Sequence, residues 1–332
     1  MMIGLSNFVF VMSLFTGTII SISSSSWLGM WIGIEMNLLS FIPLINKYKT
    51  PYETESSMKY FLVQAMGSVL FLMSIMLSEM NDFTMNINSN SYLMSLALLM
   101  KMGAAPMHFW FPGVMEGIDW MNCIILMTWQ KLAPFIILSY KILNNMIMWV
   151  IFLSVLIGSI GGLNQNSLRK IMAYSSISHL GWMLSAMLIS NNMWMLYFTI
   201  YTLMNVAVIY IFNNYSVFYL SQMYFIKNKP TMKFSMMISM LSLAGLPPFL
   251  GFLPKWLVIQ NLMFNNMFIM TLVMIMTTLL TLYFYMRIMF SSFMFTNQEM
   301  KWYMNTSNFN MLSLFMMIST MGIPLLGYLY MY

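Results

Sequence analysis

Charged residues are so scarce in this chain that it cannot fold as a water-soluble domain. Its 332 residues include 14 Lys or Arg and 8 Asp or Glu, or 7% charged residues, whereas a soluble domain carries about 25%. A soluble globule of this length needs a polar surface that so few charges cannot provide. Disorder is excluded too, because disordered chains are poor in apolar residues and this chain is 60% hydrophobic. We therefore expect an all-α integral membrane protein, since lipid-spanning helices satisfy their own backbone hydrogen bonds.

Eleven segments are apolar over roughly the 20 residues that a helix needs to cross a bilayer. They are residues 3–22, 27–46, 57–79, 91–111, 120–140, 146–163, 170–190, 193–213, 233–265, 267–291 and 309–330. The fourth contains Gly103-Ala104-Ala105-Pro106 and the ninth contains Gly245-Leu246-Pro247-Pro248, both of which interrupt helices. Backbone groups freed in this way must face protein or a water-filled cavity. We therefore predict eleven transmembrane helices, two of them broken.

The basic residues outside the span interiors fall almost entirely on one side of this topology. Lys141 is the exception. The other side collects, in its loops and at its span ends, Lys47, Lys49, Lys59, Arg169, Lys170, Lys227, Lys229, Lys233, Arg287 and Lys301. Because positively charged loops face the inside, we expect the N-terminus and these loops on the inner face and the C-terminus on the outer face.

The two broken spans lie five spans apart, which indicates an internal repeat. Residues 1–142 and 143–292 would each hold five spans with the broken helix in fourth place, and 293–332 would hold a loop and the last helix. Because five is odd, the two repeats would be inverted, as in transporters with an ion path near the midplane. Two unrelated kinked helices would give the same spacing, so this interpretation rests on spacing alone.

Four charged side chains fall inside predicted spans, where exposure to lipid is expensive. They are Glu35, Lys101, Lys131 and Lys255. Each would cost about 2.5 to 3.5 kcal/mol at the centre of a helix facing lipid, and together they would approach the stability of a typical protein. They are therefore expected to face the protein interior. A structural ion pair is the alternative, but three lysines exceed one glutamate, and the titratable lysine ammonium suits a proton path.

His179 is a further candidate for this path. It lies in the middle of a predicted span, with Ser175 one turn earlier on the same face, and it takes the place in the second repeat that Glu35 takes in the first. A hydrogen-bonded structural histidine fits the sequence equally well. Two histidines and one cysteine do not make a zinc, haem or iron–sulfur site of usual spacing. We expect no cofactor or metal in this chain.

Methionine is unusually frequent, at 46 residues, and packing gives no reason for this number. The excess is typical of an A/T-rich organellar gene in which a codon usually read as Ile is read as Met. Residues 1–22 contain no basic residue, so they predict a first membrane span rather than a secretory signal or a transit peptide. We expect a protein that is made inside the organelle.

Five blocks of sequence surround the candidate residues. They are Gly33-Ile34-Glu35-Met36-Asn37; Lys101-Met102-Gly103-Ala104-Ala105-Pro106-Met107-His108-Phe109-Trp110; Thr128-Trp129-Gln130-Lys131-Leu132-Ala133-Pro134; Leu163-Asn164-Gln165 with Leu168-Arg169-Lys170-Ile171-Met172-Ala173-Tyr174-Ser175-Ser176-Ile177; and Gly245-Leu246-Pro247-Pro248 with Gly251-Phe252-Leu253-Pro254-Lys255-Trp256. In content and order they resemble the NADH-ubiquinone oxidoreductase chain 2 family, the mitochondrially encoded, antiporter-like subunits of respiratory complex I. The length and the eleven predicted spans are similar to the short animal form of this family.

The resemblance implies a proton-translocating membrane-arm subunit, driven by electron transfer from NADH to ubiquinone in other subunits. It implies that Glu35 modulates Lys101, that Lys131 relays the proton, and that Lys255 handles its exit, with His179 in the same hydrophilic axis. It also implies an enzyme subunit without a redox centre, because NAD, FMN, the iron–sulfur clusters and ubiquinone belong to other subunits. The implied partners are other membrane-arm subunits, including neighbouring antiporter-like ones. The implied location is the mitochondrial inner membrane, with the N-terminus in the matrix and the C-terminus on the intermembrane side.

Two other functions remain open from the sequence. The first is a stand-alone cation/proton antiporter, whose fold this family shares. Intramembrane lysines argue against sodium binding, because hard cations prefer oxygen ligands. The second is a structural spacer subunit between neighbouring pumps, which predicts that neutralising Lys101 or Lys255 leaves proton pumping unchanged.

Overall fold

The computed structural model describes residues 5–80, 87–223, 230–293 and 319–320. Its regular elements are helices, and an isolated β-bridge joins Ser167 to Tyr219. The chain forms two compact units, Met1–Ser154 and Val155–Tyr332. Within the described ranges, seven segments are long and apolar enough to cross a membrane, which confirms the all-helical membrane class. The predicted last span, 309–330, lies outside the described residues except for Ser319 and Thr320.

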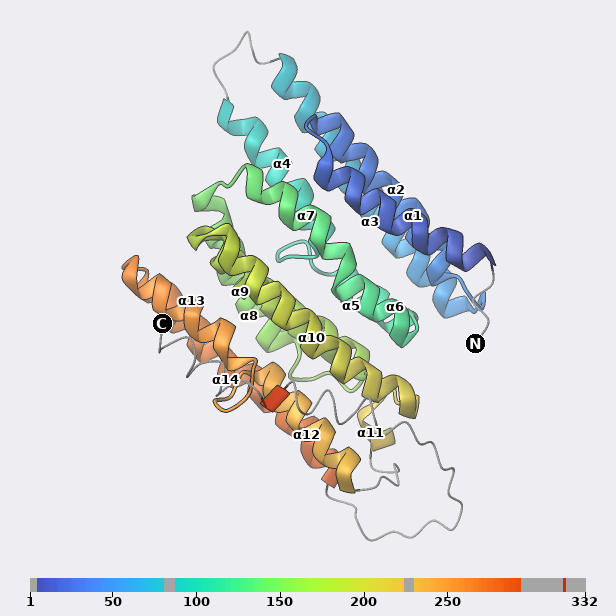
Figure 1. Cartoon of the computed structure of the whole chain (residues 1–332), viewed down its shortest axis with the longest axis vertical. Coiled ribbons are helices and arrows are strands. Elements are labelled where there is room, and N and C mark those ends of the chain that lie inside the picture. Colours follow the sequence, from blue (N-terminus) through green and yellow to red (C-terminus); the bar gives the residue numbers. More distant parts are fainter. Residues whose placement is uncertain (1–4, 81–86, 224–229, 294–318, 321–332) are drawn as a thin grey trace. The chain divides into compact units, whose positions relative to one another are not determined.

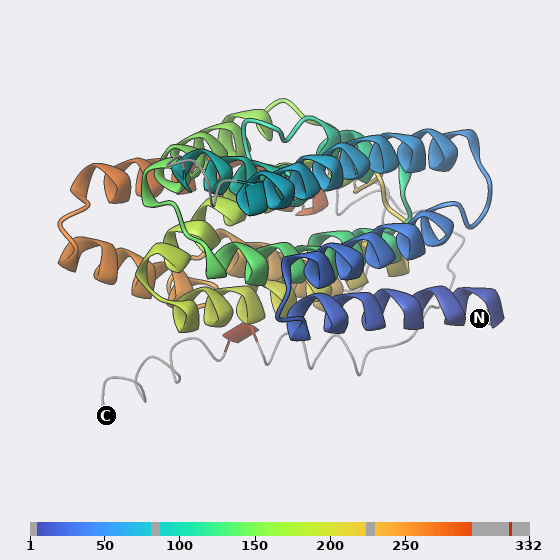
Figure 2. The same ribbon diagram turned by 90° about the horizontal axis from the view of Figure 1, so that it is seen from above.

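The helices of the first unit cover most of the predicted spans 3–22, 27–46, 57–79 and 120–140, while the helix of the predicted span 91–111 ends at Met102 (Figure 1). They are α1 (Leu5–Ser23), α2 (Trp27–Ile45), α3 (Pro51–Met80), α4 (Ile87–Met102), α5 (Trp110–Gly117), α6 (Trp120–Met127), α7 (Trp129–Tyr140) and the first part of α8 (Asn144–Gly161). The neighbouring α1, α2 and α3 run alongside one another, as both views show (Figures 1 and 2).

The helices of the second unit continue from the end of α8. They are α9 (Leu168–Ile189), α10 (Asn191–Tyr215), the short α11 (Leu220–Met223), α12 (Pro230–Ala244), α13 (Phe252–Phe264) and α14 (Phe268–Phe293). Helix α9 is buried over most of its length. Its serines, including Ser175, Ser176 and Ser178, donate to backbone carbonyls three residues earlier in the same helix, which satisfies their hydroxyl protons in this interior.

Both predicted helix breaks are present, and the two have the same local geometry. Helix α4 is followed by Gly103 (φ +74°) and α12 by Gly245 (φ +79°), each in a left-handed conformation that favours glycine. At each end, the glycine N–H bonds to the carbonyl three residues back and the next N–H bonds to the carbonyl five residues back. This is the Schellman motif, which closes a helix by satisfying its last carbonyls.

The predicted span 120–140 is confirmed as one apolar segment, Trp120–Tyr140, but its helix is not continuous. The structure interrupts it at Thr128 (φ −113°, ψ −75°), between α6 and α7. The Thr128 hydroxyl donates to the Ile124 carbonyl at 2.7 Å, a back-bond that often bends helices. Pro134 also has no N–H to offer the carbonyl of Gln130. Together these two residues weaken the hydrogen-bond ladder immediately before Lys131.

Candidate proton path

Lys101 lies in the last turn of α4, two residues before the cap at Gly103. Its side chain is 5% exposed. Its backbone carbonyl accepts a hydrogen bond from Gln64 of α3 at 3.1 Å, which ties the broken end of α4 to a continuous helix. Within the described part of the chain, the Lys101 ammonium has no hydrogen-bond partner. Burying an ammonium without a hydrogen-bond partner is costly, so this site favours water or an opposite charge nearby.

Lys131 lies in the first turn of α7, just after the interruption at Thr128, and is 2% exposed. Its Nζ is 5.1 Å from the ring centroid of Phe111, a residue of α5. An aromatic face at this distance attracts a cation. The break in one helix and the aromatic ring of another therefore place this lysine in the interior of the first unit.

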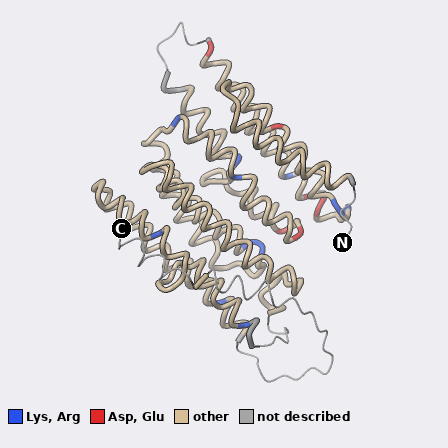
Figure 3. The backbone as a smooth tube through the Cα atoms, in the orientation of Figure 1, with Lys and Arg blue, Asp and Glu red and all other residues tan. Residues whose placement is uncertain are grey.

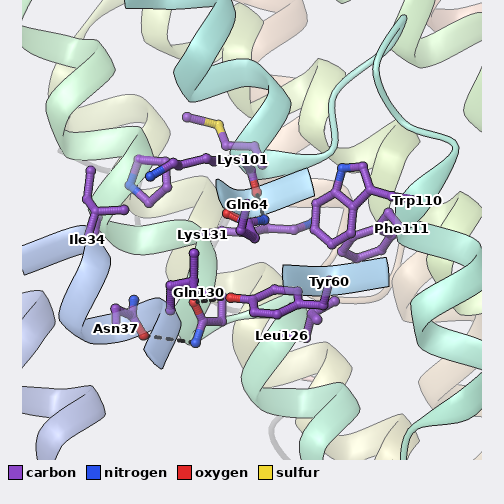
Figure 4. Close-up of a pocket in the computed structure, with 14 residues that line it drawn as sticks. Ile34, Asn37, Tyr60, Gln64, Lys101, Trp110, Phe111, Leu126, Gln130 and Lys131 are labelled. Atoms are coloured by element: carbon purple, nitrogen blue, oxygen red, sulfur yellow. Dashed lines mark hydrogen bonds between the residues drawn. The ribbon is translucent and has the colours of Figure 1, made fainter. Parts of the chain in front are cut away.

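Lys101 and Lys131 line one cavity in the first unit (Figure 4). The cavity offers about 20 Å³ to the centres of water molecules, which is room for about one water. A hydrogen-bond chain crosses its wall: Tyr60 donates to the Gln130 oxygen at 3.3 Å, and the Gln130 amide donates to Asn37 at 2.9 Å. The chain joins α3, α7 and α2 around the two lysines. The cavity is therefore water-sized and has polar groups in its wall, as proton transfer between lysines would need.

The position of the Glu35 side chain differs in part from the prediction that it faces the protein interior. It lies on α2, but the residues of α2 that line the cavity are its neighbours Ile34, Asn37 and Leu38. The Glu35 side chain is half-buried, with one carboxylate oxygen enclosed. Its carboxylate and the Lys101 ammonium do not form an ion pair within 4.0 Å among the described residues. Glu35 thus lies on a helix that lines the cavity of Lys101 without being bound to the lysine.

Lys255 follows the second break in sequence, but its side chain returns to the end of the preceding half-helix. Its Nζ donates to the carbonyls of Ala244 at 2.8 Å and Leu243 at 3.4 Å, and it lies 5.9 Å from the ring centroid of Trp182. These carbonyls form the C-terminal end of α12, where acceptors lack helical partners and the helix dipole is negative. The carbonyl end of α12 therefore holds this buried ammonium.

His179 lies on the buried helix α9 of the second unit. Its Nδ1 is 2.8 Å from the hydroxyl of Tyr197 on α10. His179 and Tyr197 line a second cavity, together with Leu243 and Pro254 from the two sides of the second break. The histidine thus lies beside the residues that hold and precede Lys255.

The sequence did not single out several polar residues of these two cavities. Tyr60, Gln64 and Gln130 complete the wall around Lys101 and Lys131, and Tyr197 binds His179. Gln64 and Gln130 could have been found as amides inside predicted spans, where a polar group needs a partner. Tyrosine gives no such signal, because it is common in membrane helices for its apolar ring. Charged residues are sparse along the helices of the described ranges (Figure 3).

The described residues contain no group of three or more His, Cys, Asp or Glu side chains that could hold a metal ion.

Broken helices with buried lysines define a class, the antiporter-like membrane proteins. In agreement, the profile of the family described as "NADH:quinone oxidoreductase/Mrp antiporter, TM" matches residues 24–281. The fold is similar to a chain of respiratory complex I from Thermus thermophilus, with a TM-score of 0.83 at 22% identity, covering 97% of this chain and 77% of that one.

Curated relatives define the family more narrowly. The NADH-ubiquinone oxidoreductase chain 2 of Anopheles gambiae is 48% identical over 336 residues, covering 98% of each chain. That of Locusta migratoria is 47% identical over 322 residues, covering 95% of this chain and 94% of the relative. The chain therefore belongs to the NADH-ubiquinone oxidoreductase chain 2 family, which confirms the resemblance seen in the sequence.

Proposed function

We propose that this chain moves protons outward across the mitochondrial inner membrane through a relay of its buried lysines. As a member of its family, it is a multi-pass membrane-arm subunit of respiratory complex I, an NADH:ubiquinone oxidoreductase, and associates with other membrane-arm subunits. The observation that carries the relay is the enclosure of Lys101 and Lys131 around one water-sized cavity. Electron transfer in other subunits, which hold the NAD, FMN, iron–sulfur and ubiquinone sites, drives the transport.

The relay begins at Glu35 and Lys101. A redox-linked change in neighbouring subunits alters the electrostatic contact between them, and Lys101 passes its proton toward Lys131 through the shared cavity. Water and side chains near His179 carry the proton on to Lys255, which releases it to the intermembrane side. The last step works against the membrane potential, about 2.3 kcal/mol per charge for each 100 mV.

The same proposal includes the architecture inferred from the sequence. Eleven transmembrane helices form two inverted five-helix repeats, 1–142 and 143–292, followed by 293–332 with the last helix. The N-terminus and the basic loops face the matrix, and the C-terminus faces the intermembrane side. The Schellman caps of α4 and α12 support the repeat, because the helix before the break then ends in the same way in each proposed repeat.

Neutralising Lys101 tests the relay against the structural spacer. We expect Lys101→Met in the assembled complex to lower the ratio of protons moved to electrons transferred, because methionine fills the site but carries no proton. The matched control is Lys59→Met, since Lys59 is an exposed lysine of the first unit that pairs with Glu55 at 2.5 Å. An unchanged ratio in Lys101→Met would favour the spacer. Cation exchange by the purified chain alone in liposomes would favour the stand-alone antiporter.

A second test addresses the carbonyl end of α12. A Cβ at Gly245 would lie 2.8 Å from Cδ and 3.1 Å from Nζ of Lys255, at a φ of +79°. We expect Gly245→Ala to displace the ammonium from the two carbonyls and to strain the cap by about 1 to 3 kcal/mol. The measurement is the proton-to-electron ratio of the assembled complex, with Gly113→Ala as control. Normal pumping in Gly245→Ala would show that Lys255 does not need this position.

A further inference from the structure

The side chain of His179 is fixed by tyrosines of the neighbouring helix. The 2.8 Å contact between Nδ1 and the Tyr197 hydroxyl joins two buried side chains, 6% and 1% exposed. Tyr201, one turn further along α10, places its ring centroid 5.0 Å from that of the histidine. A hydrogen bond and an aromatic contact from one helix together leave the imidazole little freedom to rotate.

The second cavity gives this fixed ring a place to exchange protons. His179, Tyr197 and Tyr201 line it, as does Leu243. The Leu243 carbonyl also accepts a hydrogen bond from Lys255. The cavity offers about 10 Å³ to the centres of water molecules, close to the minimum for one water. The histidine therefore shares this small space with Leu243, one of the two residues whose carbonyls hold the Lys255 ammonium.

The chemistry of a relay histidine decides which way the Tyr197 hydrogen bond runs. To take up a proton, neutral imidazole needs one bare nitrogen, and its other nitrogen carries the hydrogen. If Nδ1–H donates to the tyrosine oxygen, Nε2 is bare, and the same bond persists after Nε2 is protonated. If the hydroxyl donated to Nδ1 instead, protonation at Nδ1 would break the bond and force the hydroxyl to turn.

We propose that Tyr197 is a positioning residue that holds His179 in its Nδ1–H tautomer. The proton then arrives on Nε2, forms the imidazolium, and leaves again from Nε2, while Nδ1–H donates to Tyr197 throughout. This inference rests on the proposed relay through His179, but the tautomer can be measured independently of transport.

The first test reads the tautomer. In the assembled complex, the infrared difference spectrum between the unsubstituted protein and His179→Gln isolates the imidazole bands, whose frequencies distinguish the two neutral tautomers. We expect the Nδ1–H form, and we expect Tyr197→Phe to shift the population toward Nε2–H. A spectrum that already shows Nε2–H, or one that Tyr197→Phe leaves unchanged, would overturn the inference.

The second test is a double-mutant cycle on proton translocation. We expect Tyr197→Phe to slow translocation about tenfold, less than the loss of an acid–base group itself, and to have no further effect in the His179→Gln background. The control is Tyr210→Phe, which removes another tyrosine hydroxyl of α10, further along the helix from Tyr197. Additive effects would make Tyr197 merely structural and overturn the inference. Normal proton pumping by His179→Gln would refute the histidine step of the relay. The infrared spectrum would still decide whether Tyr197 sets the tautomer of His179.

Discussion

Replacing Lys131 by methionine is expected to stop proton translocation through this chain while leaving the chain folded. Lys131 is 2% exposed and lines the cavity that it shares with Lys101. Methionine has a similar length and an apolar end, so it fills the space without a buried charge that must be kept solvated or paired. What it removes is the group proposed to receive the proton, and loss of an acid–base group typically costs about 10²-fold or more in rate.

The measurement is the rate of NADH oxidation together with the proton-to-electron ratio, in complex carrying Lys131→Met. Lys141→Met is the matched control, because Lys141 caps the other end of α7 and is partly exposed. We expect the control to behave as the unsubstituted complex. If Lys131→Met oxidised NADH at the normal rate with an undiminished ratio, Lys131 would not be in the path.

The membrane class and both broken helices could be predicted from the sequence because they depend on large local energies. Apolar length decides whether a segment can cross lipid, and Gly103 and Gly245 end helices by their own backbone freedom. The burial of Lys101, Lys131 and Lys255 followed from the same reasoning, since lipid exposure would cost each several kcal/mol.

What the sequence could not predict depends on packing between distant segments. The interruption at Thr128 arises from a threonine back-bond and from Pro134, and both residues also occur in unbroken membrane helices. Lys255 follows Pro254, so its place at the carbonyl end of α12 depends on the path of residues 245–251. The contact between His179 and Tyr197 joins residues 18 apart on two helices. The high cost of exposing a charge to lipid predicts a buried Glu35, and this prediction holds only in part because its side chain is half-buried.

The segment between α12 and α13 leads to the prediction with the largest expected effect on stability, Gly251→Ala. A Cβ at Gly251 would lie 1.8 Å from the carbonyl oxygen of Ser242 and 2.9 Å from its carbonyl carbon. Those atoms belong to the backbone of α12, so no side-chain rotation can relieve the clash. The φ of −66° at Gly251 suits any residue, and the whole effect is therefore steric. Overpacking alone costs about 1 to 3 kcal/mol, and moving a helix backbone would add to this.

We expect Gly251→Ala to lower the amount of assembled complex and the midpoint of its thermal inactivation. Gly113→Ala is the control: its Cβ would meet nothing within 4 Å, and replacing a helical glycine by alanine is favourable by about 0.5 to 1 kcal/mol. The loss should extend to function, because displacing residue 251 from Ser242 moves α13, and Lys255 with it, away from the carbonyls of Leu243 and Ala244. If Gly251→Ala assembled fully and kept its thermal midpoint, the close packing of the second break would be wrong, and with it the position assigned to Lys255.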